Sequence, residues 1–93
     1  MRGRIVIHPM EPETPYGREY AAFCGDEILE RHFCSSDSFA KADLGFYKPE
    51  ELGENSREFA RSCREHYLKL FPEGFDVEFS ADIMEVRNNM GGL

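Results

Sequence analysis

Two histidines and two cysteines in this 93-residue sequence have the residue types and the spacing to bind a metal ion. His32 and Cys34 are two residues apart, so on a strand they would point to one face. Cys63 and His66 are three residues apart, so on a helix they would be neighbours. Together the four side chains match a tetrahedral zinc set in kind and number.

The spacing of this set matches no standard zinc finger, and an aromatic-rich domain of this size needs no metal to fold. With eight Phe and four Tyr, the chain has the apolar side chains for a core of its own. We therefore predict a protein without a cofactor, in which Cys34 and Cys63 are small buried residues. Zinc at His32, Cys34, Cys63 and His66 is the alternative.

Cysteine catalysis by Cys63, with His66 as its base, is a weaker interpretation. Cys63 falls in an apolar helical stripe, where burial raises the thiol pKa and makes the group inert. The sequence has no phosphate-binding glycine loop and no H-E-x-x-H or G-x-S-x-G motif. We lean towards a protein that is not an enzyme, and the alternative is a small enzyme or ligand-binding domain whose cleft uses His8, His32 or His66.

Three arginines, Arg57, Arg61 and Arg64, recur at i, i+4 and i+7 of the same helix and would form a stripe on its exposed side. Arginine is favoured at interfaces because its planar guanidinium binds carboxylates with two parallel hydrogen bonds. We predict this stripe as the interaction face for a protein partner or a second copy, and pairing with acids of the same helix is the simpler explanation.

The net charge of −7 disfavours nucleic-acid binding, because an acidic surface repels phosphates. No apolar run is long enough to span a bilayer, and the apolar part of the N-terminus is too short for a signal peptide. Three cysteines, an odd number, argue against a disulfide framework. These features predict a cytoplasmic protein with no membrane or nucleic-acid partner.

The strongest helix signal lies at 55–71, where Asn55 and Glu58 have the spacing of a capping box. One apolar stripe of helical period follows, made of Phe59, Cys63, Tyr67 and Leu70. A cluster of possible N-caps, Asp37 or Ser38, predicts a shorter helix before Gly45. Besides these two helices, one separate helical turn is expected to begin at Pro49.

Strands are predicted at 2–8 and 75–80. The first has an Ile-Val-Ile run that suits a central strand, and the second alternates apolar and polar residues as an edge strand would. Residues 18–35 have two interpretations, a hairpin turning at Gly25-Asp26 or a helix beginning near Pro15; we favour the hairpin. In the hairpin one face would carry Ile28, Glu30, His32 and Cys34.

These elements predict an α+β fold of two layers. A mostly antiparallel sheet of about four strands would carry one long and one short helix on one face. Residues 1–87 would form a single domain, and 88–93 a flexible C-terminal tail. The function we predict is a small acidic interaction module that binds another protein or itself, without catalysis, through a face such as the arginine stripe or a sheet edge.

Overall fold

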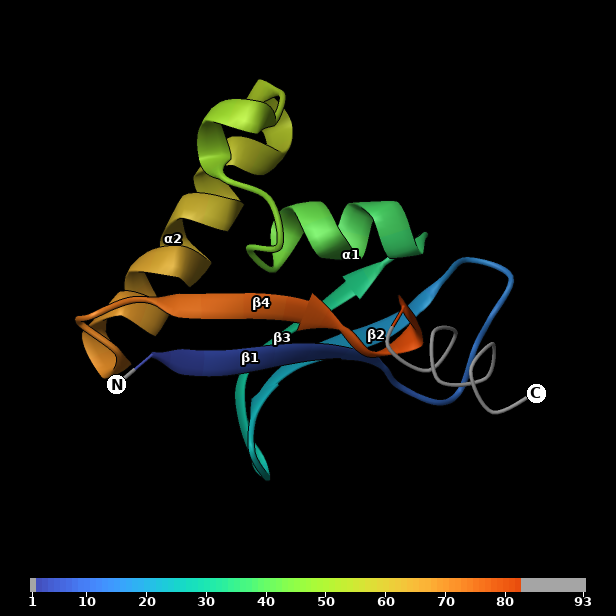
Figure 1. Ribbon diagram of the computed structural model, residues 1–93. Coiled ribbons are helices and arrows are strands. Elements are labelled where there is room, and N and C mark those ends of the chain that lie inside the picture. The colour runs from blue at the N-terminus through green and yellow to red at the C-terminus, as the bar shows by residue number, and fades with distance from the viewer. Residues whose placement is uncertain (1, 83–93) are drawn as a thin grey trace, which may run out of the picture.

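The computed structural model describes residues 2–82 and has the predicted α+β architecture (Figure 1). Two helices cover one face of a four-stranded sheet. The predicted C-terminal tail, 88–93, and the end of the predicted domain lie outside the described residues. In chain order the elements are β1 (Gly3–Pro9), β2 (Arg18–Cys24), β3 (Glu27–Cys34), α1 (Asp37–Asp43), a 3-10 turn η1 (Pro49–Glu51), α2 (Glu54–Leu70) and β4 (Phe75–Phe79).

The sheet has the strand order β3-β2-β1-β4, in which only the β1–β4 pair is parallel. β1 is central, as its apolar run predicts, and Ile5 and Ile7 are fully buried. β4 lies at one edge, also as predicted. On the outer face its acids Asp76 and Glu78 pair with Arg2 and Arg4.

The hairpin prediction for 18–35 is confirmed, and the alternative helix is wrong. β2 and β3 pair antiparallel around Gly25, whose φ of +60° is the left-handed conformation that this turn requires. One predicted detail of the hairpin is wrong. A bulge places Ile28 opposite Phe23 but Glu30 opposite Ala22, so Ile28 does not share the face of Glu30.

The long helix α2 differs from its predicted form at its start and in its buried face. It begins at Glu54 after Gly53, and no side chain caps it, so the predicted capping box does not form. Its buried line is Ala60, Cys63 and Tyr67. Phe59 and Leu70, which the predicted stripe included, border this line and are 36% and 49% exposed.

The short helix α1 closes the layer beside α2. Ser36 caps it by accepting a hydrogen bond from the Phe39 amide, one residue before the predicted caps. The Tyr67 hydroxyl of α2 donates to the Leu44 carbonyl at 2.8 Å, which joins the two helices. The core between the layers consists of Ile5, Ile7, Tyr20, Ala22, Cys34, Ala40, Leu44, Cys63, Tyr67, Phe75 and Phe79. Within residues 2–82, no helix has the length and apolar character needed to cross a membrane.

Candidate metal centre

His32 and Cys34 lie on the face of β3 that is turned towards the helices, as their spacing predicts. Each stands opposite a residue of β2, His32 opposite Tyr20 and Cys34 opposite Arg18. Cys34 belongs to the buried core and is only 4% exposed. The period of two residues along the strand therefore brings an imidazole and a thiol to the same side of the sheet.

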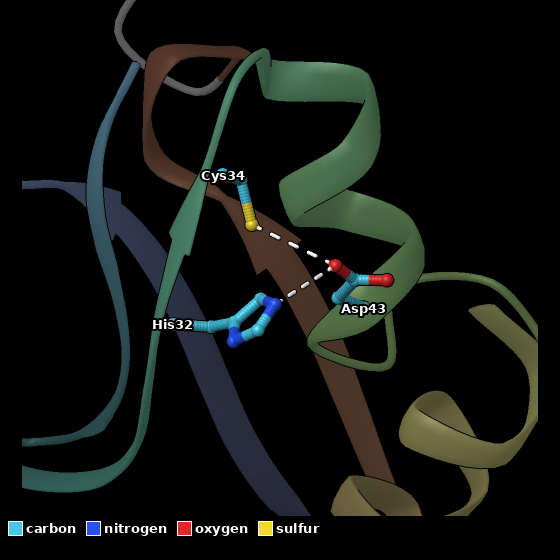
Figure 2. Close-up of side chains that lie close together, drawn as sticks. All are labelled: His32, Cys34 and Asp43. Carbon is cyan, nitrogen blue, oxygen red and sulfur yellow. Dashed lines mark hydrogen bonds and ion pairs between the residues drawn. The ribbon is translucent and has the colours of Figure 1, made fainter. Parts of the chain in front are cut away.

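The third member of the group is Asp43, the last residue of α1, which points back at β3 (Figure 2). Its Oδ2 atom lies 3.2 Å from Nε2 of His32 and 3.8 Å from Sγ of Cys34. Within residues 2–82 this is the one group of three or more His, Cys, Asp or Glu side chains whose ligand atoms all lie within 4.8 Å of one another.

The two separations that involve Asp43 are close to two edges of a tetrahedral metal site. Usual zinc bond lengths and the tetrahedral angle put a histidine nitrogen about 3.4 Å from a carboxylate oxygen, and a thiolate sulfur about 3.6 Å from it. The distances of 3.2 and 3.8 Å differ from these values by about 0.2 Å each. A tetrahedral ion would therefore need little movement of Asp43 relative to His32 and Cys34.

The thiol of Cys34 is protonated at neutral pH. Burial, the negative charge of Asp43 and the hydrogen bond to that carboxylate raise its pKa from 9.0 to about 12. The thiol thus donates to the Asp43 oxygen, which His32 also contacts. A divalent cation would replace the thiol proton and relieve the repulsion between thiolate and carboxylate.

The site lies at the margin of the core and is partly open to solvent. The side chains of His32 and Asp43 are 34% and 16% exposed. The ring of Phe59 on α2 packs against the His32 imidazole, with 4.3 Å between ring centroids and a tilt of 37° between the ring planes. This contact limits the rotation of the imidazole and shields one of its faces.

The other half of the predicted zinc set, Cys63 and His66, meets a different carboxylate. Nδ1 of His66 lies 2.6 Å from Oε2 of Glu30, and the Cys63 thiol donates to Oε1 of Glu30 at 3.8 Å. Burial and the charge of Glu30 raise the pKa of Cys63 to about 12. The third predicted histidine, His8, is exposed on β1 and packs edge-on against Phe23.

Sequence reasoning missed Asp43 and Glu30, the two carboxylates that organise these groups. Eighteen Asp and Glu residues occur in the chain, and nothing in the spacing of Asp43 sets it apart from the others. Glu30 had one available signal, since it precedes His32 by two residues on the same strand face. Asp43 had none, because its place depends on how α1 docks on β3.

The three arginines of the predicted interaction face lie in unequal surroundings. Arg61 is exposed, but Arg57 and Arg64 are half-buried. Arg57 donates to the Leu52 carbonyl at 2.9 Å, and Arg64 donates to the Gly45 carbonyl at 2.6 Å. Two of the three guanidinium groups therefore bind the protein's own backbone. The role of the arginine stripe in binding a partner stays a prediction.

A polar pocket of about 320 Å3 lies at the end of the sheet, between the β1–β2 loop and the start of α1. Tyr20 and Asp37 line it, and the Tyr20 hydroxyl donates to the Asp37 carboxylate at 2.5 Å. Burial and this hydrogen bond raise the Tyr20 pKa. None of His32, Cys34 and Asp43 lines this pocket, so it is separate from the group of possible ligands.

Comparison with known proteins gives this chain no relatives: no protein-family model, no curated protein and no solved structure matches it. Any statement about its function therefore depends on the geometry and chemistry of its own residues.

Proposed function

We propose that the protein binds a divalent transition-metal ion, zinc above all, through His32, Cys34 and Asp43. The observation that carries the proposal is the separation of the three ligand atoms, all within 4.8 Å, with both distances from Asp43 close to the edges of a tetrahedron. With the Cys34 proton removed, one thiolate and one carboxylate balance the two positive charges of the ion. Imidazole, thiolate and carboxylate are the ligands zinc takes in proteins.

Three protein ligands leave the fourth tetrahedral position open. Structural zinc sites are usually closed by four protein ligands, whereas sites that act on other molecules keep a position for water or substrate. The partial exposure of His32 and Asp43 supports access to that position from solvent. We therefore propose that a metal bound here would be available to a further ligand.

The test is a titration of the reduced protein with Co²⁺, followed by displacement with Zn²⁺. Bound in this site, Co²⁺ should give the visible bands of tetrahedral coordination and a thiolate charge-transfer band. Loss of a residue that only hydrogen-bonds to a ligand weakens metal binding about 10- to 100-fold. Asp43→Asn and Cys34→Ser each remove a ligand, so each should weaken binding by more than that. The circular dichroism of the metal-free protein should stay that of a folded domain, because all the core residues except Cys34 lie outside the proposed ligand set.

The chain supplies matched controls, since His8 and Cys24 lie outside the group. His8→Asn and Cys24→Ser should bind Co²⁺ as the wild type does. Equal loss in the control variants, or unchanged binding in Asp43→Asn and Cys34→Ser, would contradict the proposal. So would a folded wild-type protein that gives no cobalt bands.

We propose self-association through the edge strand β3 as a second function, in line with the predicted interaction module. The support is that β3 ends the sheet and that Phe33, on this strand, is 54% exposed. Sedimentation at high concentration should detect a dimer that Phe33→Ser abolishes. If instead Arg61→Glu abolishes the dimer and salt weakens it, the arginine stripe is the interface. A strict monomer at low salt would remove both possibilities.

A further inference from the structure

A second carboxylate, that of Glu30 on β3, contacts the same two ligand types as Asp43 does. Each carboxylate oxygen of Glu30 contacts one residue of α2. Oε1 lies 3.8 Å from the Cys63 sulfur, and Oε2 lies 2.6 Å from Nδ1 of His66. Each carboxylate, Asp43 and Glu30, is thus in contact with one cysteine and one histidine. The two sets contain two of the three cysteines and two of the three histidines of the chain.

The two sets are neighbours along the strand but share no ligand. Glu30 and His32 are two residues apart on one face of β3, a rise of about 6.6 Å. The Cys63 thiol contacts Glu30 of the second set, and the charges of both Glu30 and Asp43 raise its pKa. Two ions bound to the two sets would be close enough to repel each other.

The second set is less ready for an ion than the first. Its three ligand atoms do not all lie within 4.8 Å of one another, and the Glu30–His66 distance is that of a direct hydrogen bond. Both side chains are partly exposed, His66 to 38% and Glu30 to 29%, so they have room to turn. Cys63 and His66 are at i and i+3 of α2, a spacing that lets two helical side chains share one ion.

We propose that Glu30, Cys63 and His66 bind a second divalent transition-metal ion, more weakly than His32, Cys34 and Asp43 bind the first. Like the first set, this one supplies one carboxylate and one thiolate, which balance the charge of a divalent ion. The cost of breaking the Glu30–His66 hydrogen bond and the repulsion from the first ion both lower the affinity. The inference uses the same ligand chemistry as the proposed function, but it concerns different residues.

The experiment counts the ions bound by the intact chain. Native mass spectrometry at increasing Zn²⁺ should show one ion per chain at low concentration and two at higher concentration. Co²⁺ titration should give two successive increases in thiolate charge-transfer absorption, one for Cys34 and one for Cys63. His66→Asn should bind one ion with the first affinity unchanged, whereas Asp43→Asn should bind one ion more weakly than the first set of the wild type does.

Glu30→Gln is the second variant of this set, and His8→Asn is the matched control for the histidine substitution. Glu30→Gln should also bind one ion, and His8→Asn should still bind two. Cys63 is left unchanged because it is buried in the core and the partly exposed His66 and Glu30 provide two variants of the same set. Circular dichroism should confirm that each variant is folded.

The outcomes separate this inference from the proposed function. One ion in the wild type, lost in Asp43→Asn but kept in His66→Asn, would overturn the second site and leave the proposed function intact. One ion that either variant abolishes would also overturn it, since the two sets would then form a single site. Zinc retained in Asp43→Asn and lost only in His66→Asn or Glu30→Gln would support the second site and contradict the first.

Discussion

The Sγ atom of Cys34 lies 3.8 Å from the Oδ2 atom of Asp43, with the thiol buried and the carboxylate mostly so. In the metal-free protein the proton on sulfur makes this approach favourable, because a thiolate there would repel the carboxylate. Burial and Asp43 accordingly raise the pKa of Cys34 to about 12. A metal ion and this proton therefore compete for the same place.

Zinc binding should strengthen as pH rises. At pH 7 to 8 the Cys34 thiol, with its pKa of about 12, is protonated, so each ion bound by this set must displace one proton. One displaced proton changes the apparent affinity by about tenfold per pH unit. Competition titrations at pH 7 and 8 would measure this change, and a weakly buffered solution should acidify on zinc addition. An affinity independent of pH would show that Cys34 is not a ligand.

The metal-free protein should lose stability as pH rises above about 9. Below that pH the thiols of Cys34 and Cys63 are protonated in both the folded and the unfolded chain. Above it only the unfolded chain ionises them, because both folded-state pKa values are raised from 9.0 to about 12. Urea midpoints at pH 8 and pH 10 should fall accordingly, and Cys34→Ser should give a shallower fall. Equal midpoints would contradict the raised pKa values.

Truncation of Tyr67 should cost far more stability than truncation of Phe59. Tyr67 is fully buried, packs against the Phe75 ring and donates to the Leu44 carbonyl, so Tyr67→Ala should cost about 3 to 5 kcal/mol. Phe59 is 36% exposed, so Phe59→Ala should cost about 1 kcal/mol. Urea unfolding of the two variants would measure both values. Equal costs would mean that Phe59 is held in the core.

Alanine at Gly17 should disturb the fold where β3 ends. Gly17 has φ +129°, and a Cβ atom there would clash with the backbone carbonyl of Cys34. Gly17→Ala should therefore cost at least about 3 kcal/mol and weaken metal binding by moving Cys34. Gly25 is the matched control, since it has a positive φ but no atom within 4 Å of the added Cβ. Gly25→Ala should cost about 1 to 2 kcal/mol and leave metal binding unchanged.

The sequence by itself determined which segments form strands and which ligands share a strand face. The Ile-Val-Ile run of β1 predicted the central strand, and the Gly25-Asp26 turn predicted the hairpin. Both signals are local, because β-branched residues favour an extended backbone and glycine allows the left-handed conformation of a tight turn. His32 and Cys34 follow from the strand period of two residues. The caps of both helices were missed, since Ser36 caps α1 one residue before the predicted positions and no side chain caps α2.

Only the tertiary structure decided which side chains complete the two groups. Docking of α1 on β3 brings Asp43 to His32 and Cys34, and docking of α2 brings Cys63 and His66 to Glu30. The predicted four-residue zinc set is thus divided between two carboxylates. Local spacing fixes the direction of a side chain within its own element, but not the position of one element on another. That position depends on how all the apolar side chains fill the core together.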